Sequence, residues 1–132
     1  MKTILYLCHS EPDETGTNIS SEKHFLDIID QIAAGRSAFC ELFSENGYAL
    51  SIGIRESFGC AQHNKQDWDP PYLVATTAEA QQRGDGEIVF FYQEEYTPMA
   101  LRHCLPLELI KKVAVHFLNT GERSDAVEWE SV

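Results

Sequence analysis

The sequence predicts an α+β fold: a mainly antiparallel sheet of five to seven strands, with two main helices packed on one face. Two observations predict it. Short runs of β-forming residues follow one another with turn residues between them, which is typical of strands joined by hairpins. Two longer stretches, one in each half of the chain, carry apolar residues at helical spacing instead. The chain has 132 residues, the length of one domain, so we expect residues 1–132 to form a single domain.

The first elements are a strand, a loop and a helix. Thr3–Cys8 is rich in β-formers and is predicted to be a strand. Glu11–Ser20 contains turn residues and is predicted to be a loop. Ser20 or Ser21 can cap the helix that follows, and Gly35 is expected to end it. Its apolar residues at helical spacing are Phe25, Ile28, Ile29 and Ile32.

An Asn-Gly pair predicts a hairpin in the middle of the chain. Ala38–Phe43 and Tyr48–Ile54 are apolar runs, and they flank the turn Ser44–Gly47. Asn-Gly between such runs is the strongest short-range hairpin signal. Glu56–Pro71 is the least regular stretch and is predicted to be a long loop.

The second half is predicted to contain further strands. Tyr72–Thr77 is a short strand, Glu79–Gly86 a polar turn, and Glu87–Gln93 the most hydrophobic strand of the chain. Glu94 and Glu95 form a tight turn, and Tyr96–Met99 is expected to return as an edge strand.

The second helix is the clearest element. It is expected to begin at Pro106 and to end at Gly121. Ala126–Trp129 then forms a last strand. The apolar stripe of the helix contains Leu107, Ile110, Val113, Ala114, Phe117 and Leu118.

The chain is acidic, with 21 Asp and Glu residues against 10 Lys and Arg residues and a net charge of −11. Both halves of the chain share the excess, so the whole domain is acidic. Such a surface repels nucleic acid and anionic membranes and attracts basic partners. The competing interpretation is that the acidic residues only keep the protein soluble. The N-terminal apolar run is shorter than a secretory signal, and no stretch approaches a membrane span. We therefore expect a soluble, cytoplasmic protein.

Two groups of residues are weighed as chemical sites. Cys8-His9 and His103-Cys104 are neighbours in sequence, but neighbouring residues on a strand point to opposite faces, so a buried cysteine beside an exposed histidine is the favoured interpretation. Cys60 and His63 form a single metal half-site without a second pair, so no metal or cofactor is predicted. The alternative kept open is a small enzyme or a ligand- or metal-binding domain that uses Cys60, His63 or Cys104. No other catalytic signature is present.

Two acidic and aromatic segments are typical of protein-binding surfaces. Asp67, Trp68 and Asp69 lie together in the predicted long loop, and Glu94-Glu95-Tyr96 is predicted to form a hairpin tip. Tryptophan and tyrosine dominate interface hot spots. The competing interpretation of the hairpin tip is a charged turn that protects the edge of a sheet.

Glu87–Val132 resembles a known family. The strand Glu87–Tyr96, the run Leu105–Glu108 at the start of a helix, Thr120–Arg123 and Val127–Trp129 together resemble the family of immunity proteins numbered one in bacterial polymorphic-toxin systems. One departure is that Ser124-Asp125 replaces a proline common in the family. The resemblance carries over a fold and a role, and no catalytic residues.

The resemblance implies an immunity protein that binds and neutralises a cognate secreted toxin and is itself no enzyme. Toxins paired with this family include nucleases and nucleic-acid deaminases, which usually have a basic cleft that a −11 protein would cover in a one-to-one complex. No nucleic-acid or membrane partner is expected. The competing role is an adaptor for some other basic protein. The residues predicted to bind the toxin are Glu56, Asp67, Trp68, Asp69, Glu94, Glu95 and Tyr96.

Overall fold

The computed structural model describes residues 3–8, 17–19, 21–34, 38–92 and 95–132. In chain order the elements are β1 (Thr3–Cys8), β2 (Thr17–Asn18), α1 (Glu22–Ala34), β3 (Ala38–Ser44), β4 (Tyr48–Arg55), β5 (Phe58–Lys65), β6 (Leu73–Thr76), α2 (Ala78–Gln81), β7 (Glu87–Tyr92), β8 (Glu95–Ala100), the 3-10 turn η1 (Leu101–His103), β9 (Leu105–Pro106), α3 (Leu107–Thr120) and β10 (Glu128–Ser131).

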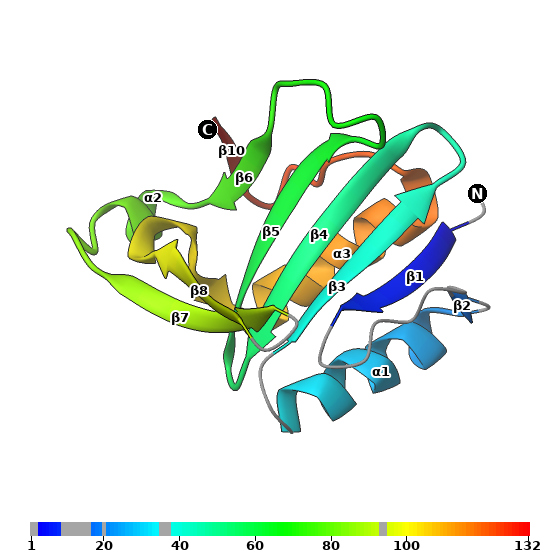
Figure 1. The fold of residues 1–132 in the computed structure, drawn as a ribbon, viewed down its shortest axis with the longest axis horizontal. Coiled ribbons are helices and arrows are strands. Elements are labelled where there is room, and N and C mark those ends of the chain that lie inside the picture. The colour runs from blue at the N-terminus through cyan, green and yellow to red at the C-terminus, as the bar shows by residue number, and fades with distance from the viewer. Residues whose placement is uncertain (1–2, 9–16, 20, 35–37, 93–94) are drawn as a thin grey trace.

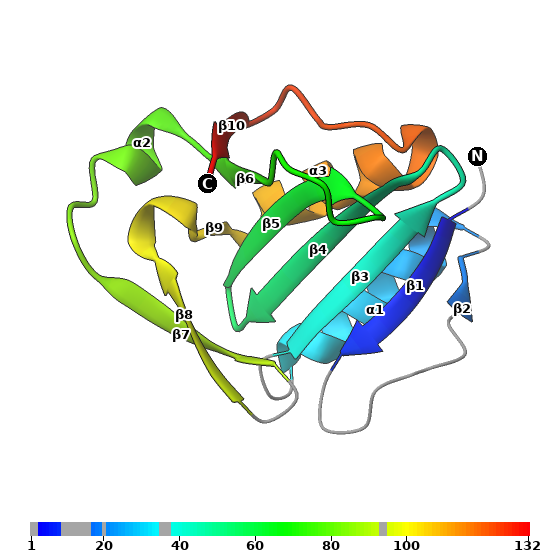
Figure 2. The same ribbon diagram turned by 45° about the horizontal axis from the view of Figure 1, so that its top comes forward.

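One antiparallel sheet dominates the fold, in the order β10-β6-β5-β4-β3-β1-β2, with the two-residue β9 pairing with β5. Six of its strands have four residues or more. Helix α3 lies behind this sheet in both views and α1 lies behind it in Figure 2 (Figures 1 and 2). Both helices contribute to the same core against the sheet, so they cover the same face. Strands β7 and β8 form a separate hairpin. The predicted α+β class, with two main helices on one face, is confirmed.

The main core fills the space between the sheet and the two helices. Along β4, Leu50, Ile52 and Ile54 are buried in this core, because alternate residues of a strand point to the same face. Ile110 and Phe117 of α3 pack against them from the helix side and are also fully buried. The helical periodicity of the sequence therefore identified the face of α3 that contacts the sheet.

A smaller core lies between the opposite face of the sheet and the β7–β8 hairpin. Phe90 of β7 is fully buried there, with Cys60 and Cys104. Its ring centroid lies 5.9 Å from that of Phe39 on β3. The Arg55 guanidinium donates a 2.5 Å hydrogen bond to the carbonyl of Val89 and fixes the hairpin to the end of β4.

Several element ends follow the sequence signals. The backbone N–H of His24 donates to Ser21 Oγ, so Ser21 caps α1. Gly47 has a φ of 91° in the β3–β4 turn, and Gly121 ends α3 with a φ of 72°. Both are left-handed conformations that glycine adopts without a steric penalty. Gly35 lies outside the described residues.

The predicted long loop over Glu56–Pro71 is wrong. Half of it is β5, an eight-residue strand that pairs with β4 along its whole length; residues 56–57 form the β4–β5 turn, and residues 66–72 form a loop. The alternation of apolar and polar residues is absent from β5 because both of its faces are covered, so His63 and Asn64 are buried as well. Gly59 lies in close contact with α3, where a Cβ would come within 2.9 Å of Ile110.

Two smaller corrections concern short elements. The predicted polar turn Glu79–Gly86 contains the helix α2, whose first turn is capped by the side chain of Thr77. The last strand begins at Glu128 instead of Ala126, since Ser124 forms a turn in which its hydroxyl accepts from the backbone N–H of Ala126.

Candidate functional site

Three connections meet at one end of the main sheet: the β3–β4 turn, the β5–β6 loop (residues 66–72) and the α3–β10 loop (residues 121–127) (Figure 2). Asn46 of the first connection donates a 2.9 Å hydrogen bond to the carbonyl of Gly121 in the third. Gln66 of the second donates to the carbonyls of Ser44 and Tyr48. The three connections are therefore joined to one another by hydrogen bonds.

The β5–β6 loop presents Trp68 to solvent. The side chain is 50% exposed, the largest exposure of any tryptophan, phenylalanine or tyrosine whose side chain is described. Its φ of 65° lies in the left-handed region, and its backbone is held by the Tyr72 hydroxyl, which donates to its carbonyl. The backbone N–H of Asp69 donates to Asp67 Oδ1 over 3.0 Å. Asp67, Trp68 and Asp69 thus share one exposed turn that is held by hydrogen bonds.

A cavity of about 680 Å³ opens beside this loop. Its walls come from β4, β5, β6, β10 and the α3–β10 loop. The residues that line it are Tyr48, His63, Lys65, Pro71, Leu73, Gly121, Glu122, Arg123, Ser124, Asp125, Val127 and Trp129. Aromatic rings and apolar side chains therefore form much of the surface, while both acidic and basic residues stand at the edge.

His63 and Ser124 are the buried polar residues among those that line this cavity, and each has 5% of its surface exposed. Its ring stacks on Tyr48 with the centroids 4.9 Å apart, and the rings of Phe117 and Trp129 approach it edge-on at 5.8 and 6.1 Å. Burial lowers the pKa of His63 to about 4, and the positive charge of Arg123 acts in the same direction. His63 is consequently neutral at pH 7.

One ring nitrogen of His63 lacks a partner. His63 Nε2 is buried and has no hydrogen-bond partner among the described residues. The backbone of Gly121 raises the pKa of the imidazole, but this effect is smaller than the lowering by burial and by Arg123.

Three other residues predicted to bind the toxin, Glu56, Glu95 and Tyr96, lie at the opposite end of the sheet. Glu56 is exposed in the β4–β5 turn, with a φ of 54°. Glu95 and Tyr96 begin β8, whose partner β7 contacts this end of the sheet through Arg55 (Figure 1). Glu94 lies outside the described residues. Since β5 has eight residues, the two groups are separated by about 25 Å.

Cys60 and His63 do not form a joint site. They are three residues apart on β5, so their side chains point to opposite faces of the sheet. Cys60 belongs to the smaller core with Cys104, and burial raises the pKa of its thiol to about 12. His63 lies on the helix side. Within the described part of the chain, no group of three or more His, Cys, Asp or Glu side chains is placed to hold a metal ion.

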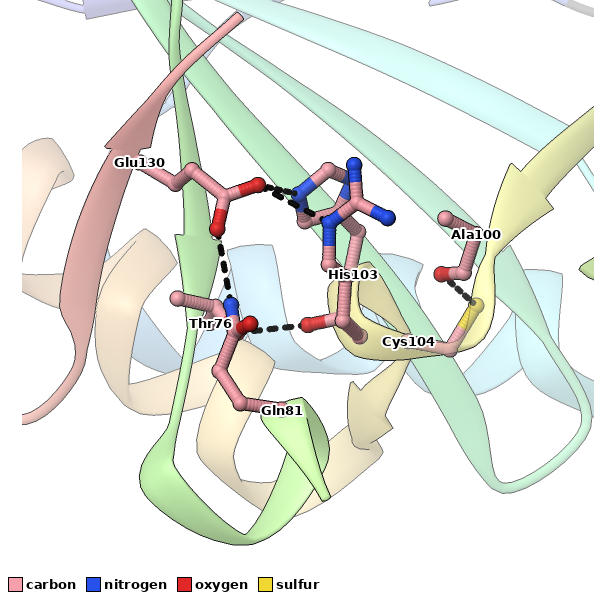
Figure 3. A network of polar contacts seen from close by, with 7 residues as sticks. Thr76, Gln81, Ala100, His103, Cys104 and Glu130 are labelled. Atoms are coloured by element: carbon pink, nitrogen blue, oxygen red, sulfur yellow. Dashed lines mark hydrogen bonds and ion pairs between the residues drawn. The ribbon is translucent and has the colours of Figure 1, made fainter. Parts of the chain in front are cut away.

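His103 and Cys104 also point away from each other (Figure 3). Cys104 Sγ contacts the carbonyl of Ala100 at 3.4 Å, whereas His103 Nε2 lies 2.9 Å from Glu130 Oε1. The expectation of an exposed histidine on a strand is wrong here, because His103 is 6% exposed and lies in η1. The partner that buries it, Glu130, is distant in sequence.

Glu130 fastens the edge strand β10 to the neighbouring segments. One carboxylate oxygen accepts from Arg102 at 2.9 Å and contacts His103, and the other accepts from Gln81 at 2.8 Å (Figure 3). The hydrogen bonds from Arg102 and then His103 lower the pKa of this carboxyl to about 2. Next to it, Trp129 donates through Nε1 to the carbonyl of Ser124, which positions its ring at the cavity.

Sequence reasoning missed the cavity. Tyr48 and Trp129 belong to predicted strands, Arg123 to a segment that carries the family resemblance, and His63 to a metal half-site, so no pattern brings the four residues together. The Asn-Gly turn and the glycine that ends α3 mark two of the three connections, but their meeting depends on how α3 packs against the sheet, which no local pattern encodes. None of the described helices is long and apolar enough to cross a membrane.

A comparison with curated proteins finds no match to this chain. A comparison with protein families does: the model of immunity protein Imm1 matches residues 13–131. The match spans all three connections, the cavity and both helices, and it agrees with the resemblance in the C-terminal part of the sequence. The chain therefore belongs to the Imm1 family of immunity proteins.

Proposed function

We propose that this immunity protein binds a cognate secreted toxin domain in the cytoplasm, in a one-to-one complex, and neutralises it by covering its active site. The toxin is proposed to be an enzyme that acts on nucleic acid, a nuclease or a deaminase. Such enzymes present a basic cleft to their substrate. The observation that carries this proposal is the net charge of −11, because a strongly acidic protein associates with a basic cleft at an electrostatically enhanced rate.

The proposed contacts are the seven residues Glu56, Asp67, Trp68, Asp69, Glu94, Glu95 and Tyr96. Acidic side chains would pair with toxin lysines and arginines, while Trp68 and Tyr96 would supply anchoring area. Because the two groups stand at opposite ends of the sheet, a toxin must either span the whole domain or use one end. The Trp68 end is favoured by its half-exposed ring and by the adjoining cavity.

The first experiment is co-purification with the product of the neighbouring toxin gene, followed by titration of its toxicity. A stable one-to-one complex that abolishes toxicity supports the proposal, and the enzymatic assay of the free toxin identifies the nucleic-acid chemistry. Absence of both complex and protection would refute it.

Paired charge reversals then locate the interface. Asp67→Lys with Asp69→Lys changes one end of the sheet, and Glu94→Lys with Glu95→Lys makes the same charge change at the other. The pair at the interface should slow association about tenfold or more at low salt, with the difference shrinking as salt screens the charges. Equal effects from both pairs would indicate long-range steering alone.

A further inference from the structure

We infer that Lys65 and Arg123, which line the cavity beside the Trp68 loop, bind an acidic side chain of the cognate toxin and set the orientation of the complex. A toxin that fits this site carries an aspartate or a glutamate within its otherwise basic surface. This inference rests on the proposed function and adds to it the charge pattern by which the immunity protein distinguishes its own toxin from another basic protein.

The side chains of Lys65 and Arg123 are exposed, and neither has a hydrogen-bond or ion-pair partner among the described residues. Acidic residues outnumber basic ones by 21 to 10, so a basic side chain of this protein readily finds an acidic neighbour. Among the other lysines and arginines that the structure describes, Lys112 also lacks a partner, whereas carboxylates or backbone carbonyls hold the rest: Lys23, Arg55, Arg83, Arg102 and Lys111.

Both unpaired cations belong to the same cavity. Lys65 lies two residues after His63 on β5, so the two side chains point to the same face of the sheet. Burial is the main cause that lowers the pKa of His63 to about 4, and the positive charge of Arg123 is the next, so the guanidinium lies close to the cavity wall. Two positive charges therefore reach one cavity, one from β5 and one from the α3–β10 loop.

The backbone is fixed on both sides of Arg123. The backbone N–H of Glu122 donates a 3.1 Å hydrogen bond to Thr120 Oγ1. On the other side, the carbonyl of Ser124 accepts from Trp129 Nε1 at 2.9 Å. A side chain presented from an ordered backbone loses less conformational entropy when a partner binds, so Arg123 is well placed for recognition.

The acidic side chains at the cavity are unpaired as well. Glu122 and Asp125 are exposed and line the cavity, but within the described part of the chain neither forms an ion pair with Lys65 or Arg123. Charges of both signs thus surround the cavity without neutralising one another. A uniformly basic toxin surface would place cations against Lys65 and Arg123, whereas a surface that carries one carboxylate there meets every charge with its opposite.

The surroundings of the two cations favour a carboxylate. Tyr48, Pro71 and Leu73 contribute aromatic and apolar surface to the cavity, and an ion pair is stronger where such surface excludes water. A guanidinium binds a carboxylate through two parallel hydrogen bonds, which fixes direction as well as distance. Once the toxin covers this site, loss of either cation would leave the carboxylate of the toxin without its partner, and affinity would fall.

Neutralising substitutions in the full-length protein test the inference. Lys65→Gln and Arg123→Gln are compared with the matched control Lys112→Gln, an exposed and unpaired cation on α3 that does not line the cavity. Surface plasmon resonance measures binding to the toxin domain of the neighbouring gene. All three changes make the protein more acidic, so long-range attraction to a basic toxin alone predicts equal or tighter binding in each. A paired carboxylate instead predicts that Lys65→Gln and Arg123→Gln weaken binding at least about tenfold, mainly through faster dissociation, while Lys112→Gln does not.

The outcomes separate the inference from the proposed function. If both cavity variants bind the toxin as tightly as Lys112→Gln, the inference is overturned and the immunity function stands. A wild-type protein that binds no toxin overturns both. The melting temperatures of the variants should stay close to that of the wild type, because neither side chain forms a hydrogen bond or an ion pair with the described residues.

A charge exchange then identifies the carboxylate. Arg123→Glu should bind the toxin at least about 100-fold more weakly than the wild type, because it places two carboxylates against each other. The aspartates and glutamates of the toxin domain are replaced by lysine one at a time. One of these toxin variants should bind Arg123→Glu more tightly than it binds the wild type. If none of them does, the proposed pairing with Arg123 is overturned.

Discussion

Glu130→Gln keeps the size of the side chain and removes the carboxylate charge that joins β10 to the rest of the domain. The glutamine oxygen can still accept one hydrogen bond, but its amide faces the amide of Gln81, and the ion pair with Arg102 is lost. We expect this single change to loosen the strand that carries Trp129, and therefore to lower both the stability of the domain and the order of the cavity wall.

The magnitude follows from the pKa of the carboxyl group. A pKa lowered from 4.5 to about 2 corresponds to at most about 3.4 kcal/mol of stabilisation of the charged form. The Arg102 side chain is 48% exposed and that of Glu130 is 31% exposed, so solvent screening reduces the contribution to about 1–2 kcal/mol. For a domain of this size the melting temperature should fall by about 4–8 °C at pH 7.

The sign of the pH dependence provides the assay. Because the folded pKa is lowered, the contribution is complete above the unfolded value of 4.5 and is lost as the pH falls towards 2. Urea unfolding of the wild type and of Glu130→Gln should thus differ at pH 7, and the difference should shrink as the pH falls from 4.5 towards 2. Glu128→Gln, an exposed position on the same strand, is the matched control and should change little. A difference that stays constant from pH 7 to 3 would refute the electrostatic explanation.

Three further predictions concern the two cores and the cavity. Gly53→Ala should destabilise the domain by about 1–3 kcal/mol in urea unfolding, because the new Cβ would lie 2.7 Å from Cys60 Sγ. Adding Cys60→Ala should recover part of this loss; if the losses of the two single variants simply add in the double variant, the contact is not the cause. The wild type should lose stability as the pH falls from 6.5 towards 4, since the unfolded chain binds a proton at His63 that the folded chain excludes. His63→Phe should flatten this part of the curve of unfolding free energy against pH; curves of the two proteins that stay parallel would contradict this explanation. Cys40, Cys60 and Cys104 are buried, so mass spectrometry should find them unlabelled by iodoacetamide in the native protein and labelled in urea, and rapid native labelling of any of them would show that the cores open readily.

Local patterns were sufficient for several elements. The stripe of α3, the Asn-Gly turn between β3 and β4, and the hydrophobic run of β7 each predicted the observed element to within a few residues. The stripe of α3 is clear in the sequence because one side of this helix meets the core while the other side is less buried. These signals were enough to infer the α+β class.

Strand β5 shows why the rest was not predictable. Helix α3 covers one of its faces and the β7–β8 hairpin approaches the other, so its residues are small or polar on both sides and no alternation remains. Glycine usually indicates an interruption of a strand. Gly59 instead lies within β5, where Ile110 of α3 packs so close that a Cβ would not fit. The acidic loop around Trp68 was recognised from composition alone, whereas the cavity beside it depends on partners such as Trp129 that are remote in sequence.

The make-up of the cavity has a consequence for synthesis of the protein on the ribosome. Tyr48 and Trp129, which face the same histidine, are separated by more than half of the chain, and Trp129 takes its place only when β10 pairs with β6. A nascent chain can already contain the β3–β4–β5 meander and α1 while one wall of the cavity is still missing. The cavity is therefore complete only once the last strand has left the ribosome and paired with β6.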